Sequence, residues 1–294
     1  MMTRTGHFPI GLRRGWGDWQ KNDLHAFLRW IKENGFAAVD LMNVTRDDLA
    51  AVREAGLRLG SADLLDFGQI MASDTGKRRD VIAKNVQYVT DLGAAGVKVF
   101  FTCVIPGDPK RPRSENYSLA VECYSPIAQA AAKSGAKIAI EGWPGGAPHY
   151  ATLCCTPETM RAFLRDVPGN AIAVNYDPSH LIRLGVDHVR FLREFLPHVA
   201  HVHAKDTELF EESIYELGRF QGSAFSQPHG FGEFTWRYTL PGKGTAHWPQ
   251  IFRVLKDADY DGIVSIELED EAFNGSEAGE KAGFINSLEF LKST

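Results

Sequence analysis

The sequence is poor in cysteine, and its four cysteines, Cys103, Cys123, Cys154 and Cys155, follow no regular spacing. A fold held together by disulfides needs more cysteines at closer intervals than a chain of 294 residues with four of them provides. This excludes the small disulfide-rich class of protein, and we expect the thiols to be reduced.

Long apolar runs are missing as well. No stretch of about 18 apolar residues is present to span a bilayer, and the first residues, MMTRTGHFPIGLRRGW, lack the apolar segment of a signal peptide. We therefore expect a cytoplasmic protein with no membrane partner.

An excess of basic charge is the third absence. The 32 Lys and Arg residues are outnumbered by 37 Asp and Glu residues, which leaves a formal net charge of −5. Nucleic acids attract proteins through positive charge, so this balance does not indicate nucleic-acid binding. We expect no nucleic-acid partner.

Strand patterns and helix patterns alternate along the whole chain. We expect strands within the ranges 8–15, 38–42, 57–66, 97–104, 137–143, 171–180, 199–207 and 262–270. Eight strand–helix units predict an α/β fold, a (β/α)8 TIM barrel that residues 1–294 form as a single domain. A doubly wound open sheet is the alternative, and the lack of a Gly-rich phosphate loop favours the barrel.

Four of the expected strands run directly into a ligand-type side chain. These side chains are Glu141, Asp177, His203 and Glu267, and the stretch AHVHAKDTE at 200–208 is the central one. Single carboxylates at strand ends are most often helix caps or salt-bridge partners. Three carboxylates and one imidazole together favour a site for a hard or borderline divalent ion, such as Mn²⁺, Mg²⁺, Co²⁺ or Zn²⁺.

Other polar residues near these strand ends have two readings each. Lys205 either binds substrate or closes a salt bridge at the rim, and a site role is slightly favoured. His201 points to the same face as His203 and is expected in the core or behind the ligands. Trp143 and His149, in the loop WPGGAPHY, either line the pocket or form a structural turn. Asp63 and Asp66 either reach the pocket or cap the segment that follows them, and capping is favoured.

A long connection interrupts the alternation at 208–244. It is rich in Gly and aromatic residues, and loops of this length in a compact domain are usually functional or disordered. After the seventh barrel strand it would lie on the active-site face, where Trp236 and Arg237 could cover a polar ligand such as a sugar. The alternative is a self-packed surface loop that mediates contact in a homo-oligomer.

Five motifs occur in an order typical of one family. They are AIEGWPGG, YDPSHL, HAKD, GKGTAHW and a YDG-x-x-SIE pattern ending at Glu267, and together they cover about residues 130–292. In this order the sequence resembles the xylose isomerase-like TIM-barrel superfamily. The resemblance implies that Glu141, Asp177, His203 and Glu267 bind one divalent metal, with Mn²⁺ the first expectation. It further implies that His180 contacts substrate, and that Glu141 and Glu267 shuttle protons on opposite faces of it.

The chemistry that follows is proton removal next to a carbonyl, with a metal acting as Lewis acid on the enediolate. We expect an isomerase or epimerase acting on a small-molecule carbohydrate: a sugar, a sugar acid or a cyclitol. One alternative is a lyase that dehydrates a ketocyclitol or eliminates the aglycone of a 3-keto-glycoside. The other is a carbohydrate-binding barrel without turnover. The lack of a phosphate loop favours an unphosphorylated ligand.

Overall fold

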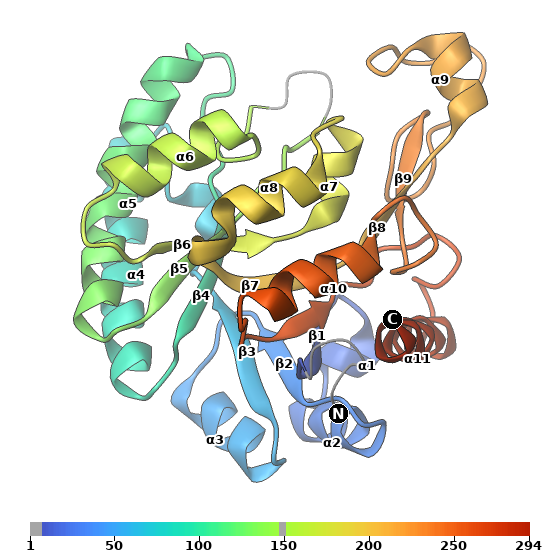
Figure 1. The fold of residues 1–294 in the computed structure, drawn as a ribbon. Coiled ribbons are helices and arrows are strands. Elements are labelled where there is room, and N and C mark those ends of the chain that lie inside the picture. The colour runs from blue at the N-terminus through green and yellow to red at the C-terminus, as the bar shows by residue number, and fades with distance from the viewer. Residues whose placement is uncertain (1–7, 147–150) are drawn as a thin grey trace.

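The computed structural model describes residues 8–146 and 151–294. Eight parallel strands close into a barrel in the order β1-β10-β7-β6-β5-β4-β3-β2. Their side chains are almost all buried, as parallel strands covered by helices require. The predicted single-domain (β/α)8 barrel is therefore confirmed (Figure 1). The strands are β1 Ile10–Arg13, β2 Ala38–Leu41, β3 Arg58–Asp63, β4 Val99–Cys103, β5 Lys137–Glu141, β6 Ile172–Tyr176, β7 Val199–Ala204 and β10 Val264–Ile266.

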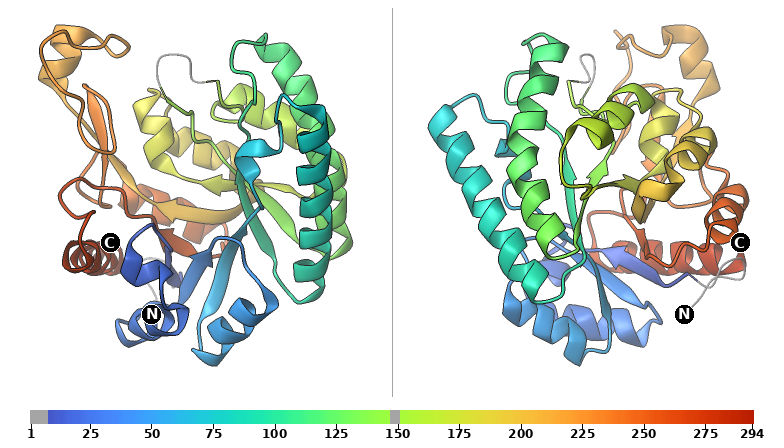
Figure 2. Two further views of the ribbon diagram at one scale, coloured as in Figure 1. Left: turned by 180° about the vertical axis from the view of Figure 1, so that it is seen from behind. Right: turned by 60° about the vertical axis from the view of Figure 1, so that its left-hand side comes forward.

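Helices surround the barrel (Figures 1 and 2). Their first turns show why they begin where they do: Thr45 and Asp48 form a reciprocal capping box, and Asp74 accepts a hydrogen bond from the backbone N–H of Lys77. Between and around the strands lie α1 Asp18–Lys21, α2 Leu24–Glu33, α3 Arg46–Glu54, η1 Phe67–Gln69, α4 Thr75–Ala94, α5 Arg113–Lys133, α6 Pro157–Asp166, α7 Pro178–Arg183, α8 His188–Phe195, η2 Leu196–His198, α10 Trp248–Asp257 and α11 Glu277–Ser293.

The connection after the seventh barrel strand contains regular secondary structure. β8 Asp206–Leu209 pairs antiparallel with β9 Trp236–Thr239, and α9 Glu211–Leu217 lies beyond them. This hairpin and α9 project from the barrel, as Figures 1 and 2 both show. The sequence predicted a long loop at 208–244, whereas the structure shows a two-stranded ribbon that begins at Asp206.

The structure also bears on the cysteines and on membrane-spanning helices. All four cysteines are buried and free, in agreement with the predicted thiols. Within 8–146 and 151–294, no helix combines the length and the apolar character needed to cross a membrane.

Candidate metal centre and adjoining cavity

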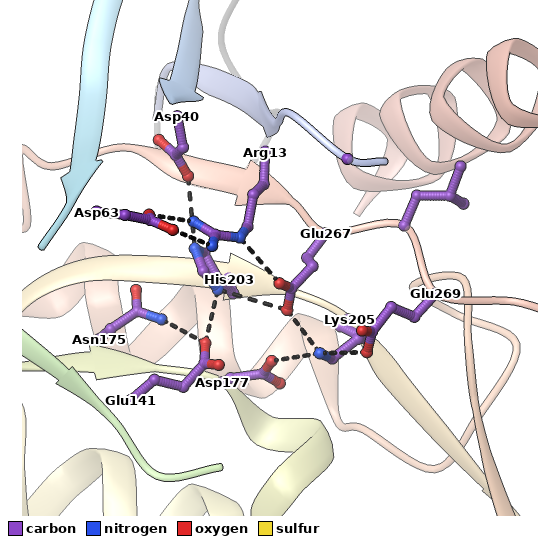
Figure 3. Close-up of polar contacts among 12 residues, drawn as sticks. Arg13, Asp40, Asp63, Glu141, Asn175, Asp177, His203, Lys205, Glu267 and Glu269 are labelled. Atoms are coloured by element: carbon purple, nitrogen blue, oxygen red, sulfur yellow. Dashed lines mark hydrogen bonds and ion pairs between the residues drawn. The ribbon is translucent and has the colours of Figure 1, made fainter. Parts of the chain in front are cut away.

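The four predicted ligands converge at the carboxyl ends of four strands. Glu141 ends β5, Asp177 follows β6, His203 lies in β7 and Glu267 follows β10. One ligand atom from each lies within 4.8 Å of every other (Figure 3). Nδ1 of His203 is 2.6 Å from Oε2 of Glu141 and 3.6 Å from Oε2 of Glu267. Residues from four separate stretches of the sequence therefore form one cluster.

The cluster has the properties of a cation site. The carboxylates of Glu141 and Asp177 are buried and that of Glu267 is partly buried, and holding them together is costly unless positive charge compensates them. Oδ1 of Asp177 accepts a hydrogen bond from the Ser179 N–H, whereas its buried Oδ2 has no hydrogen-bond partner among the described residues. Burial raises the pKa of Asp177. Oxygen donors and one imidazole nitrogen are a set that fits a divalent ion.

Both glutamates are in the form that binds a metal or accepts a proton. Burial and Glu267 oppose charge on Glu141, but His203 and His180 outweigh them and hold its pKa below the usual value. Burial also opposes charge on Glu267, yet Lys205, His203 and Arg13 hold the pKa of this carboxyl far below its ordinary range. The pair is therefore ionised at neutral pH.

A buried carboxylate from β2 supports the far side of the His203 ring. Oδ2 of Asp40 lies 3.4 Å from Nε2 of His203 and 2.9 Å from Nε2 of His201, and Oδ1 accepts a hydrogen bond from the Ser61 N–H. A side chain at Gly60 would collide with Asp40, so the glycine makes room for it. His201 thus lies behind the ligands, as expected. Asp40 was missed by sequence reasoning, although a carboxylate within the apolar run AAVDLM was an available signal.

Arg13 from β1 fixes the position of Glu267. Its guanidinium donates two hydrogen bonds of 2.7 Å to Asp63, and its Nε is 3.1 Å from Oε1 of Glu267. The guanidinium also lies over Phe101, which stacks on His203 with ring centroids 5.2 Å apart. The expected capping role of Asp63 was wrong, because both of its oxygens face Arg13 within the barrel. Arg13 itself gave no signal in the sequence.

Lys205 is buried inside the cluster rather than at its rim. Its Nζ lies 2.5 Å from Oε2 of Glu267, 2.9 Å from Oε2 of Glu269 and 3.5 Å from Oδ2 of Asp177. Burial opposes charge on this ammonium, but the carboxylates outweigh it and raise its pKa well above the ordinary value. Lys205 therefore stays charged and faces the same oxygens that would hold a metal.

His180 joins the cluster to the projecting hairpin. Its Nε2 is 3.2 Å from Oε1 of Glu141 and 3.4 Å from Oδ2 of Asp177, and its Nδ1 is 2.7 Å from the Tyr238 hydroxyl. Asn175 donates a 2.7 Å hydrogen bond to the other oxygen of Glu141. The placement of β9 thus sets the orientation of a residue beside the ligands.

The remaining predicted substrate residues are placed differently. Trp236 is buried, with the Arg183 guanidinium 4.5 Å from its ring centre. Side chains alternate along β9, so Arg237 points away from the face that carries Trp236 and Tyr238. On its own face, Arg237 forms ion pairs with Glu208 at 2.8 Å and with Glu271 at 2.5 Å. The structure therefore does not bring Arg237 to the cluster. Trp143 is partly buried just after β5, and the prediction for His149 falls outside the described residues.

A cavity of about 530 Å³ adjoins the cluster at Glu267. The loop after β1, the segment after β10 and Phe231 of the projecting connection form its walls. Pockets of this size suit small organic ligands. The cluster and cavity together are the arrangement expected of an active site at the carboxyl face of a barrel.

The fold and the cluster define a class: a (β/α)8 barrel with a buried carboxylate and histidine centre at the carboxyl ends of its strands. Within this class, the chain belongs to the xylose isomerase-like TIM barrel family, whose model matches residues 8–294. The resemblance seen in the sequence motifs is confirmed.

Curated relatives are similar over part of the chain. The uncharacterized protein YfiH of Bacillus subtilis is 31% identical over 160 residues, which are 54% of this chain and 46% of YfiH. An inosose dehydratase of Clostridium perfringens is 29% identical over 186 residues, 61% of this chain and 60% of that enzyme. The chain thus spans about half the length of the curated relatives it matches.

Solved structures are similar over nearly the whole chain. The 3-keto-D-glucoside 4-epimerase YcjR of E. coli has a TM-score of 0.69 over 97% of this chain and 99% of that one, at 17% identity. Mannonate dehydratase of Streptococcus suis has a TM-score of 0.71 over 98% of this chain and 93% of that one, at 14% identity. A xylose isomerase-like TIM barrel protein of Mycobacterium smegmatis in complex with magnesium has a TM-score of 0.62 over 97% of each chain, at 16% identity. At these identities the likeness shows the shared fold.

Proposed function

We propose that this chain is a metal-dependent isomerase or epimerase of a sugar, sugar acid or cyclitol, which removes and returns a proton next to a carbonyl group. One observation carries the proposal: two ionised glutamates face the same imidazole from opposite sides of β7. Glu267 comes from β10, which neighbours β7 on one side, and Glu141 comes from β5 on the other. Two bases that flank one position can remove a proton from one face of a substrate and return it to the other.

Glu141, Asp177, His203 and Glu267 would hold the metal, for which we propose Mn²⁺, with Mg²⁺, Co²⁺ and Zn²⁺ as alternatives. When bound, a divalent ion stabilises negative charge on a carbonyl oxygen as the neighbouring proton leaves. The donor set of three carboxylates and one imidazole supports an ion of this kind.

The residues of the chain itself exchange the proton, position the base and bind the substrate. Glu141 and Glu267 exchange the proton, and Arg13 keeps Oε1 of Glu267 in place through a 3.1 Å contact. His180 and Lys205 present N–H groups beside the ligands, where they can donate hydrogen bonds to substrate hydroxyls. Trp143, His149, Trp236 and Arg237 stay predictions as substrate contacts, and Arg237 would have to leave Glu208 and Glu271 to serve as one.

A lyase that uses the same first step is the second candidate. Elimination needs an acid to protonate the leaving oxygen, and the Lys205 ammonium lies 2.5 Å from Glu267, the base beside it. The inosose dehydratase relatives support this candidate, since a dehydratase eliminates water. A carbohydrate-binding barrel without turnover is the third candidate. Cytoplasmic location and homo-oligomer formation stay predictions.

The test is solvent-deuterium exchange on Mn²⁺-loaded protein with ketoses, aldoses and keto-inositols, followed by proton NMR. Deuterium next to a carbonyl in a stereoisomer supports the epimerase, and deuterium in an unsaturated product supports the lyase. Glu267→Gln should lower exchange by about 10²- to 10⁴-fold, because it removes a base. Glu289→Gln, an exposed carboxylate on α11, is the matched control. Exchange unchanged in Glu267→Gln would contradict the assignment.

A further inference from the structure

The cavity beside Glu267 is larger than one sugar ring needs. A hexose occupies roughly 180 Å³, about the liquid volume of six water molecules, whereas the cavity has about 530 Å³. The cavity begins at Arg13 and Glu267 and extends away from the other three ligands, toward α1 and α11. A sugar placed over the cluster would therefore leave most of this space open.

Two exposed aromatic rings line the space. Trp16, in the loop after β1, has 65% of its surface exposed, and Phe231 of the projecting connection has 44% exposed. Exposed aromatic rings that gather in one cavity, as these two do, are typical of a ligand-binding groove, and aromatic planes pack well on the apolar faces of other rings.

Both rings are held by ordered backbone. The N–H of Gly15 donates a 2.6 Å hydrogen bond to Gln20, and a side chain at Gly17 would collide with Glu280, so the loop around Trp16 has little freedom. Phe231 has a φ of 55°, a left-handed conformation that bulky residues rarely adopt, and its carbonyl accepts a 2.9 Å hydrogen bond from the Tyr238 N–H. The two aromatic walls are therefore preorganised.

The charge of the cavity excludes an anionic ligand. Its two guanidinium groups are already engaged: Arg13 binds Asp63 and Glu267, and Arg14 donates to the backbone carbonyls of Gln20 and Lys21. Five carboxylates line the same space, namely Asp18, Glu267, Glu269, Glu277 and Glu280. A phosphate or carboxylate group would be repelled, whereas a neutral ring would not.

We infer that this cavity is a subsite for a second, neutral ring, so that the substrate is a glycoside whose first ring lies over the cluster and whose second ring packs against Trp16 and Phe231. The inference rests on the proposed function for the position of the first ring. The second ring is either another sugar or an aromatic aglycone, because both offer an apolar face of the same kind.

The test is calorimetric titration of Mn²⁺-loaded protein with methyl β-D-glucopyranoside, phenyl β-D-glucopyranoside and cellobiose. We expect at least one of the two-ring compounds to bind about fivefold to tenfold more tightly than the methyl glycoside. A gain for cellobiose alone identifies the second ring as a sugar, and a gain for the phenyl glycoside identifies it as an aromatic aglycone. Equal affinities, or no binding of any of the three, would overturn the subsite.

Substitutions of the two aromatic residues test whether they cause the tighter binding of the two-ring compounds. Trp16→Ala and Phe231→Ala should each remove most of it, and Trp16→Phe should keep it because the aromatic face remains. Phe225→Ala is the matched control, since this ring is fully exposed and does not line the cavity. Deuterium exchange with single-ring keto-sugars tests the proposed reaction separately: exchange without a two-ring preference overturns only the subsite, and the preference without exchange overturns only the reaction.

Discussion

Asp40 and His203 meet in the centre of the barrel, where Oδ2 of the carboxylate lies 3.4 Å from Nε2 of the imidazole. The other nitrogen of the same ring, Nδ1, faces Glu141 and Glu267. A carboxylate behind a histidine fixes which nitrogen carries the proton and leaves the other free for a metal. The two imidazoles of His201 and His203 outweigh the effect of burial and keep the pKa of Asp40 below its usual value. Asp40 is therefore ionised and suited to this positioning role.

Asp40→Asn should weaken metal binding by about tenfold to a hundredfold, because the neutral amide holds the His203 tautomer less firmly. The measurement is a competition titration of Mn²⁺, together with nitrogen NMR of the His203 tautomer in the protein loaded with diamagnetic Mg²⁺. A merely structural role would lower stability without changing the tautomer. Asp187→Asn, which alters a carboxylate at the N-cap of α8, serves as the control and should change neither readout.

Lys205→Met should strengthen metal binding while it lowers turnover. The ammonium lies near Glu267 and Asp177, two of the proposed ligands, so it repels a cation held by the same oxygens. Removal of a unit charge a few ångströms away should raise the Mn²⁺ affinity by at least about tenfold. Turnover should fall, since a hydrogen-bond donor to the substrate hydroxyls is lost. Lys84→Met, at an exposed position on α4, is the control. Unchanged or weaker Mn²⁺ binding in Lys205→Met would show that the metal lies elsewhere.

The convergence of Glu141, Asp177, His203 and Glu267 could be predicted from the sequence, because each follows an apolar run that identifies its strand and parallel strands bring their carboxyl ends together. Asp40, Asp63 and Arg13 could not be placed in the same way. Arg13 and Asp63 are 50 residues apart and Asp40 and His201 are 161 apart, so their contacts depend on how the barrel closes. Local pattern carries no information about which side chains meet across the barrel interior.

Gly244→Ala should destabilise the protein by about 2 kcal/mol, because an added Cβ would overlap the Asp206 carboxylate and the Thr207 carbonyl. Asp206 organises this turn by accepting hydrogen bonds from the N–H groups of Gly242 and Ala246. The motif GKG thus has a packing reason for its second glycine. Urea unfolding is the measurement. Gly68→Ala is the matched control, since its added Cβ would meet no atom within 4 Å and should leave stability nearly unchanged.

The protein should lose stability in mild acid through His188. Burial, together with the stacked His247, lowers the pKa of His188 to about 4 from 6.5. The folded state therefore favours the neutral ring, and below pH 6.5 the unfolded chain binds a proton that the folded chain does not. This contribution to stability is complete above the unfolded value and is lost as the pH falls from about 6.5 to about 4.

The expected loss between pH 7 and pH 5 is about 2 kcal/mol in the free energy of unfolding. Nε2 of His188 accepts a 3.1 Å hydrogen bond from the backbone N–H of His247. The amide oxygen of a glutamine can accept the same hydrogen bond. His188→Gln should therefore stay folded and show a smaller decrease over the same pH range, because glutamine does not titrate. Urea unfolding of both proteins at the two pH values gives the comparison, and the difference between them removes the contribution of every other group. Equal decreases in the two proteins would mean that His188 is protonated as readily in the folded state as in the unfolded chain.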